Sequence, residues 1–173
     1  MEKIMPEAWR CPCLENASKA TEASITSDEI ASYLGNLLAQ TSFGNHERES
    51  LIRCQMYHMQ IMGVISEPEL ITDKDLEWIA GKYVEIRDMV KPVTGYIMPS
   101  GSVPATMMHI IRAKTRFLAR YVYLMIANEN KKCEPLLEFV NMLSNYYFYF
   151  AIWLNEQAGI DNSLYKSFSQ LRK

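Results

Sequence analysis

The sequence predicts an all-α protein, a five-helix up-and-down bundle. Its 173 residues include only 7 Gly and 7 Pro, and long stretches contain neither residue, as long helices require. Within those stretches the apolar residues recur every three or four positions, which is the spacing of a helix with one buried face. Because the links between the stretches are mostly short, we expect neighbouring helices to run antiparallel.

The first predicted helix begins near Ser27, and residues 26–173 are interpreted as one helical domain. Thr26 or Ser27 is the expected cap, and Asp28 and Glu29 then place negative charge at the positive end of the helix dipole. The apolar positions that follow keep helical spacing: Ile30, Leu34, Leu37 and Leu38. Residues 1–25 are polar, small and aperiodic, so they are interpreted as a loosely ordered N-terminal arm.

Two further helices come before the long internal loop. One covers about residues 47–65 and ends at Glu67-Pro68. The next is capped by Thr72, with Asp75 where a capping box places its reciprocal carboxylate, and it stops at Lys91-Pro92.

The loop, residues 92–104, leads into the fourth and fifth helices. Pro104 suits the first turn of the fourth helix, which continues to about Asn128. After a short polar turn, the fifth helix covers about residues 134–158, and Gly159 is a plausible C-terminal cap.

Composition excludes several classes of function. The net charge of −2 favours no general binding to nucleic acid, and the longest apolar runs are too short to span a bilayer. The first residues do not resemble a signal peptide, so we expect a cytoplasmic protein with reduced thiols. Cys11 and Cys13 are one residue apart, too close for the usual zinc framework, and no metal site is predicted.

The fourth helix carries the most informative pattern. His109, Arg112, Arg116 and Arg120 recur at steps of three and four, which places them along one face. One interpretation is a solvated face whose arginines pair with glutamates. The other is a phosphate site, because the guanidinium is a planar donor that never deprotonates. The opposite face is expected to pack through its apolar residues Ile110, Phe117, Leu118 and Leu124.

Three other features bear on this choice. The segment Pro99-Ser100-Gly101-Ser102 leads into a helix N-terminus, where free N–H groups favour an anion, although the same residues describe an ordinary turn. Asp28 is either part of an N-cap pair or the partner of a stripe arginine. Asn141, within the aromatic fifth helix, is satisfied by backbone or reserved for a ligand.

Four segments in order resemble the propanediol-utilisation type of ATP:corrinoid adenosyltransferase. The segment Tyr96-Ile-Met-Pro-Ser-Gly-Ser, followed by His109-Ile-Ile-Arg112, resembles the signature F-[IV]-L-P-G-G-S and H-x-x-R of that family. The segment from Thr26 to Gly35 is similar to its T-x-D-E-L-x-S-x-[IL]-G helix. Residues 55–63 and 141–148 resemble its I-Q-x-x-L-F-x-L-G and N-R-L-S-D-Y-L-F segments.

The resemblance implies a homotrimer with active sites between subunits. There the 5′-deoxyadenosyl group of ATP, free or as its Mg²⁺ complex, passes to cob(I)alamin and triphosphate leaves. Matched residue by residue, Asp28 would pair with Arg112 and brace the site. Tyr96 would stand beside the lower face of the corrin. The ATP-binding residues would be Arg116, Arg120 and Asn141.

The sequence also departs from the family pattern. The family opens with a Gly-rich arm that wraps the ATP phosphates, whereas residues 1–25 contain no Gly. In the R-R-x-E-R run of the fourth helix, Phe117 and Ala119 replace the second Arg and the Glu. Besides an adenosyltransferase, the sequence therefore leaves open a non-catalytic corrinoid- or nucleotide-binding bundle that has lost the triphosphate clamp. A plain oligomeric bundle that binds no ligand is the third hypothesis.

Overall fold

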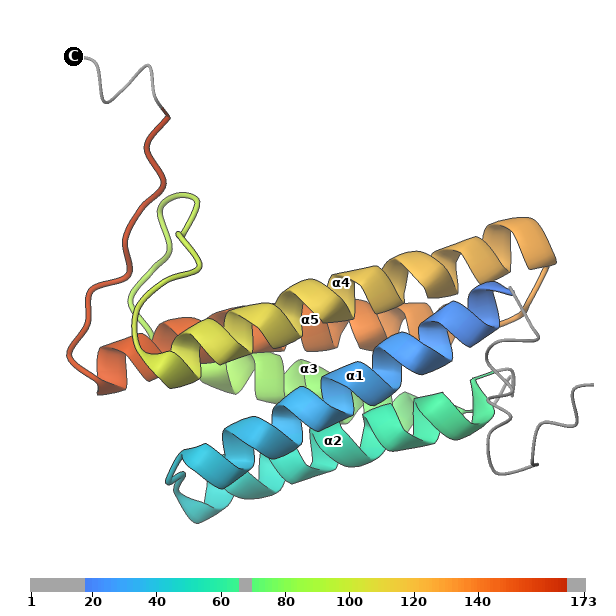
Figure 1. The fold of residues 1–173 in the computed structure, drawn as a ribbon, viewed down its shortest axis with the longest axis horizontal. Helices are drawn as coiled ribbons and strands as arrows, with labels where there is room; N and C mark the ends of the chain where they lie inside the picture. Colours follow the sequence, from blue (N-terminus) through green and yellow to red (C-terminus); the bar gives the residue numbers. More distant parts are fainter. Residues whose placement is uncertain (1–17, 66–69, 168–173) are drawn as a thin grey trace, which may run out of the picture.

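The computed structural model describes residues 18–65 and 70–167, and these form a five-helix bundle (Figure 1). The only β-pairing within the described residues is an isolated bridge. The predicted all-α, five-helix class is therefore confirmed. The helices are α1 (Lys19–Gln40), α2 (Asn45–Val64), α3 (Asp73–Asp88), α4 (Val103–Glu129) and α5 (Glu134–Gln157).

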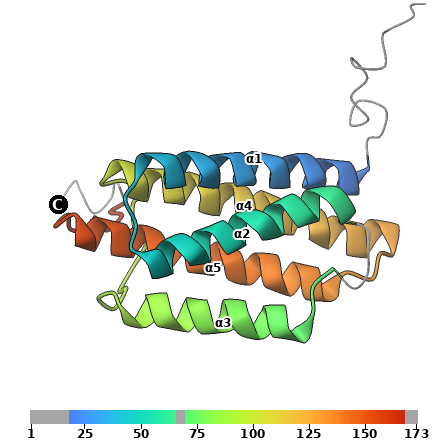
Figure 2. The same ribbon diagram turned by 90° about the horizontal axis from the view of Figure 1, so that it is seen from below.

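Each helix packs along its length against its neighbours. α4 contacts both α5 and α1, α1 also contacts α2, and α5 also contacts α3. In Figure 2, α1 lies at one edge of the bundle and α3 at the other. No described helix combines the length and the apolar character needed to cross a membrane. Large side chains from several helices fill the interior, among them Ile30, Leu34, Leu51, Ile79, Leu118, Phe139, Tyr147 and Phe150.

The start of α1 corrects the sequence prediction. The helix begins at Lys19, and the side chain of Ser18 caps it by accepting from the backbone N–H of Thr21 at 3.2 Å. Neither Thr26 nor Ser27 is a cap, because both are buried inside the helix. Residues 19–25 are therefore helical, since their apolar positions extend the core-facing stripe by two turns. The rest of the predicted arm lies outside the described residues, and so do Cys11 and Cys13.

The other element boundaries follow the predicted signals. Thr72 and Asp75 form the expected capping box, in which the Thr72 backbone donates to the Asp75 carboxylate at 3.0 Å. Pro104 lies in the first turn of α4, which Ser102 caps by accepting from the backbone of Ala105. Gly159 follows α5 with φ +67°, the left-handed conformation in which glycine is favoured as a helix stop.

A polar chain crosses the otherwise apolar core. The Ser27 hydroxyl donates to the backbone carbonyl of His58 at 2.9 Å, so it accepts from the ring N–H at Nδ1, 3.1 Å away. His58 Nε2 then accepts from the Tyr147 hydroxyl at 3.2 Å, which also bonds the Cys54 thiol. The pattern defines the tautomer of His58 and gives this residue a structural role.

Candidate functional site

The predicted stripe on α4 changes from buried to exposed along its length. His109 is 3% exposed, Arg112 is half-buried, and Arg116 and Arg120 are exposed. None of the ion pairs among the described residues involves these arginines. Among the described residues, no glutamate therefore pairs with the arginines of the stripe.

At the buried end of the stripe, polar atoms lack partners among the described residues. Both ring nitrogens of His109 and the Nε of Arg112 are buried and make no hydrogen bond to residues 18–65 or 70–167. The ring of Phe148 lies beside both residues, 6.5 Å from the His109 ring and 5.7 Å from the Arg112 guanidinium carbon. Buried polar groups are almost always hydrogen-bonded, so these atoms are candidates for bonding a group beyond the described residues.

The charges at this place favour an anion. Burial lowers the pKa of Arg112, and so does the charge of Arg116. Burial, and secondarily the charge of Arg112, lowers the pKa of His109 to about 4. At neutral pH, His109 is therefore uncharged and offers one donor and one acceptor. The guanidinium of Arg112 carries a positive charge, and no carboxylate of the described residues pairs with it. Leaving a partly buried charge unpaired is costly, so binding an anion there would be favourable.

Asn141 of α5 lies on the same side of the bundle as the arginine stripe of α4. α5 returns antiparallel to α4, and the contact of Phe148 with Arg112 sets the register. Arg120 lies eight residues beyond Arg112, about 12 Å along α4, and Asn141 lies seven residues before Phe148, about 10 Å along α5. Asn141 is exposed. The helical register therefore brings it level with Arg120, on the face of α5 that carries Phe148.

Asp28 and Arg112 do not pair within the chain. Asp28 is exposed on α1, and its neighbour Glu29 makes the ion pair with α4, to Lys114 at 2.8 Å. Positions 112 and 114 are about 200° apart around a helix. Lys114 consequently faces α1, while Arg112 faces α5, so the pair expected across the bundle is not made.

The apolar residues opposite the stripe pack only in part. Leu118 is fully buried and Leu124 is partly exposed, but Phe117 is 59% exposed and Ile110 is 42% exposed. The prediction that Phe117 and Ile110 pack within the bundle is wrong. The two residues are seven apart, only about 20° from each other around the helix, on a flank of α4 that neither α1 nor α5 covers.

The loop before α4 projects from one end of the bundle beside the C-terminal segment (Figure 1). Tyr96 is 84% exposed at its tip. The isolated bridge joins Ile97 to Leu164, so the segment 160–167 is the partner of this loop. Two N–H groups at the start of α4 are already engaged, because Ser102 donates to the Asn155 side chain and Ala105 donates to Ser102.

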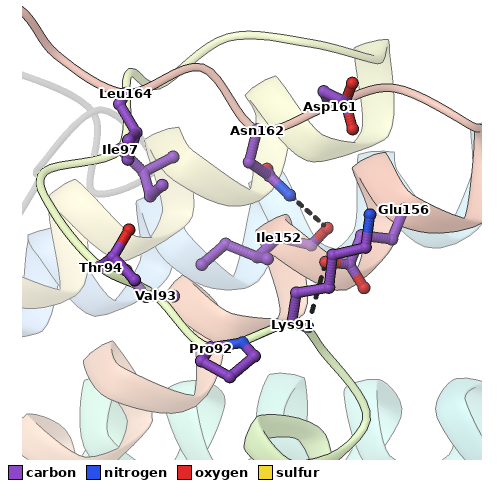
Figure 3. A pocket seen from close by; sticks show the side chains of 10 residues that line it. All are labelled: Lys91, Pro92, Val93, Thr94, Ile97, Ile152, Glu156, Asp161, Asn162 and Leu164. Atoms are coloured by element: carbon purple, nitrogen blue, oxygen red, sulfur yellow. Dashed lines mark hydrogen bonds between the residues drawn. The ribbon is translucent and has the colours of Figure 1, made fainter.

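A pocket of about 270 Å³ opens between the loop, the end of α5 and the segment 160–167 (Figure 3). Glu156 borders it and accepts from the backbone of Lys91 at 3.2 Å. The rest of the lining mixes polar residues with apolar ones from all three segments, among them Pro92, Ile97, Ile152 and Leu164. Because of this pocket, the loop is only partly packed against the end of α5.

Sequence reasoning missed Asn155. Its side chain is 1% exposed, and it lies four residues after the buried Ala151 and eight after the buried Tyr147 on α5. An amide on the buried face of a helix requires specific partners, and that position was the available signal. Within residues 18–65 and 70–167, no cluster of three or more His, Cys, Asp or Glu residues could hold a metal ion.

Comparison with known proteins gives a consistent family. The protein-family profile described as "Cobalamin adenosyltransferase" matches residues 10–154. The "Corrinoid adenosyltransferase" of Bacillus subtilis (strain 168) is 26% identical over 157 residues, which cover 86% of this chain and 81% of that protein.

Solved structures share the fold. A variant of the PduO-type ATP:corrinoid adenosyltransferase from Lactobacillus reuteri, complexed with cobalamin and ATP, superposes with a TM-score of 0.75 at 21% identity, over 87% of this chain and 85% of that one. A second variant of that enzyme, complexed with ATP, has a TM-score of 0.76 at 20% identity, over 87% and 89% of the two chains.

Proposed function

This chain belongs to the cobalamin adenosyltransferase family, and we propose that it transfers the 5′-deoxyadenosyl group of ATP to a reduced corrinoid. In this reaction the cobalt–carbon bond forms at C5′ as the C5′–O bond breaks, and triphosphate leaves with the electron pair of that bond. The protein positions the two substrates and balances charge, while the corrinoid supplies the nucleophile.

One observation carries the proposal: the buried nitrogens of His109 and Arg112 have no hydrogen-bond partner in the part of the chain that the structure describes. A ligand-free structural bundle would gain stability from apolar side chains at both positions. Uncompensated positive charge beside a neutral imidazole suits an anionic substrate with further polar groups, such as a nucleotide. The hypothesis of a plain bundle that binds no ligand does not explain why polar residues, His109 and Arg112, occupy these two positions.

The proposed roles follow the buried-to-exposed order of the stripe. Arg116 and Arg120 hold the phosphates and stabilise the leaving triphosphate, and Asn141, level with them on α5, contacts the nucleotide. Tyr96 stands at the lower face of the corrin, where it excludes water and the axial base. Its 84% exposure leaves its ring available for such a contact.

We further propose that the site forms between subunits of a homotrimer in the cytoplasm. Asp28 is exposed, and Arg112 pairs with no carboxylate in the described part of the chain. The two residues lie on different flanks of the bundle, so Asp28 of one subunit can pair with Arg112 of a neighbouring subunit. The exposed apolar flank of α4 that contains Ile110 and Phe117 supports the same arrangement, because a subunit contact would bury it.

A second candidate function is corrinoid or nucleotide binding without transfer. Phe117, 59% exposed, stands where the family signature has a second arginine, and Ala119 stands where it has a glutamate. The described residues therefore carry a reduced set of phosphate ligands. The absence of a Gly-rich arm remains a prediction, because residues 1–17 lie outside the described residues.

Titration of the purified protein with ATP and cob(I)alamin tests the proposal. Adenosylation is followed by the change in corrin absorbance, and triphosphate is quantified separately. Equimolar triphosphate and adenosylated product support transfer. Corrinoid or nucleotide binding without either product supports the second candidate function, and the absence of binding to both substrates contradicts both candidates.

A further inference from the structure

Asn155 is the most heavily hydrogen-bonded side chain among the described residues, and it holds three segments together. Its Oδ1 accepts from the backbone N–H of Ser102 at 2.9 Å and from the Ser102 hydroxyl at 3.3 Å. Its Nδ2 donates to the carbonyl of Ser100 at 2.9 Å and to the side chain of Asn162 at 3.0 Å. The amide therefore uses both its acceptor and its donor groups, and it lies at the junction of the Tyr96 loop, α5 and the C-terminal segment.

Gly101 leaves room for the side-chain amide of Asn155. Its φ is +119°, a conformation that side chains other than glycine rarely adopt. A Cβ built on Gly101 would overlap the side chain of Asn155. Any other residue at this position must therefore either change the backbone of the loop or displace the amide.

Two backbone hydrogen bonds extend the attachment outward to the tip of the loop. Met98 donates to the carbonyl of Ser163 at 2.8 Å, and Tyr165 donates to the carbonyl of Tyr96 at 2.7 Å. At the base of the segment, Asn162 also donates to the carbonyl of Ile152 at 3.3 Å. The C-terminal segment is thus joined to α5 at one end and to Tyr96 at the other.

Hydrogen bonds hold the loop in place, with a smaller contribution from the partly buried Ile97. Tyr96 is 84% exposed, so its side chain buries little surface within the chain. The pocket beneath the loop separates it from the end of α5 (Figure 3). If the Asn155 contacts were lost, the tip of the loop would still be joined to the C-terminal segment, but Ser100 and Ser102 would lose the hydrogen bonds that hold the base of the loop against α5.

We propose that Asn155 is the positioning residue for Tyr96, and that the C-terminal segment 160–167 forms part of the corrinoid site by bracing the loop. This inference rests on the proposed function, in which Tyr96 contacts the corrin. The arginine stripe and Asn141 do not depend on these bonds. Disturbing the Asn155 junction should therefore weaken corrinoid binding while leaving nucleotide binding intact.

The test compares Gly101→Ala with Gly95→Ala in the full-length protein. Both changes add one methyl group to a glycine of the same loop. The new methyl group at residue 95 meets only Leu164 at an ordinary 3.5 Å, whereas at residue 101 it overlaps Asn155. Asn155→Ala is a second route to the same loss. ATP affinity and the thermal midpoint are measured for every variant, because a fold-wide defect would lower both.

Two readouts locate the effect. Amide hydrogen exchange at Met98 and Tyr165 reports the attachment of the loop, and the visible spectrum of cob(II)alamin reports corrinoid binding. We expect Gly101→Ala and Asn155→Ala to speed exchange at both amides and to weaken corrinoid binding by about tenfold or more. ATP affinity should change by less than about twofold, and Gly95→Ala should resemble the wild type.

Unchanged exchange in Gly101→Ala would overturn the role of Asn155. Faster exchange with unchanged corrinoid affinity would overturn the role of the braced loop in the site. An equal loss of ATP and corrinoid affinity would show a general structural effect and would also overturn the inference. If the wild-type protein bound no corrinoid, the proposed function would fail, and exchange would still decide whether Asn155 holds the loop.

Discussion

The phenolic hydroxyl of Tyr147 on α5 donates a hydrogen bond to Nε2 of His58 on α2, at 3.2 Å, where both side chains are fully buried. Because Nδ1 of the same ring donates to Ser27 on α1, this neutral tautomer links three helices. Protonating Nε2 would break the bond to Tyr147 and place a charge in the core. The folded state therefore accommodates His58 only as the neutral imidazole.

Stability should consequently fall in mild acid. Burial lowers the pKa of His58 to about 3 in the folded protein, below its usual value of about 6.5. The unfolded chain therefore binds the proton first, and stability present above pH 6.5 is lost as the pH falls towards 3. The loss reaches at most about 5 kcal/mol. Urea unfolding between pH 7.5 and 4 measures it.

The control for this pH dependence is His58→Gln, which keeps a donor and an acceptor but does not titrate. It should remove much of the pH slope between 6.5 and 4. His109 contributes a smaller slope of the same sign, because its pKa is lowered to about 4. An identical slope in His58→Gln and the wild type would contradict the assignment.

Replacing each buried histidine by leucine should separate stability from binding. His58→Leu removes the acceptor of the Tyr147 hydroxyl and the ring N–H that Ser27 accepts from, so unfolding free energy should fall by about 2–4 kcal/mol. His109→Leu removes ring nitrogens that have no partner among the described residues, so the change in unfolding free energy should be within about 1 kcal/mol. Urea unfolding gives both values.

Ligand binding should respond in the opposite way to these two changes. The His109→Leu variant should bind substrate more weakly while remaining folded, and calorimetric titration with ATP and corrinoid measures this. A large loss of stability in His109→Leu would indicate that its ring serves the fold, and it would remove the main support for the site.

Arg116→Ala should weaken nucleotide binding by about 1.5–3 kcal/mol, the range for a hydrogen bond to a charged group. Lys114→Ala is the matched control, because it removes the same charge from the same helix but on the flank that pairs with Glu29. Its effect on ATP affinity should be small. Equal effects of the two variants would show that net charge, rather than contact with Arg116, governs binding.

Mixing two inactive variants tests the location of the site. Asp28→Ala and Arg112→Ala should each lose activity. If the pair joins neighbouring subunits, equimolar mixed trimers should recover activity in about one quarter of their sites, since each intact site takes one residue from each variant. No recovery, with mixed assembly verified by mass spectrometry, would place the site within a single chain.

The sequence by itself determined the helices and much of the candidate site. Runs with helical apolar spacing, the Thr72 and Asp75 capping box and Gly159 were all readable because they depend on residues within one or two turns. The arginine stripe was readable for the same reason. The sequence could not locate the start of α1, because Thr26 and Ser18 are equally good capping residues by type. Only the packing of α1, which buries Thr26, distinguishes them.

Only the tertiary structure decided what the stripe and the loop contact. Whether Arg112 meets a carboxylate, and whether Phe117 is covered, depends on which helices flank α4, and helical spacing is the same in either case. Asn155 and Gly101 are 54 positions apart in the chain. In the fold they are so close that a single methyl group added at Gly101 would overlap the Asn155 side chain. Such contacts arise when distant segments meet, so packing, rather than local pattern, sets them.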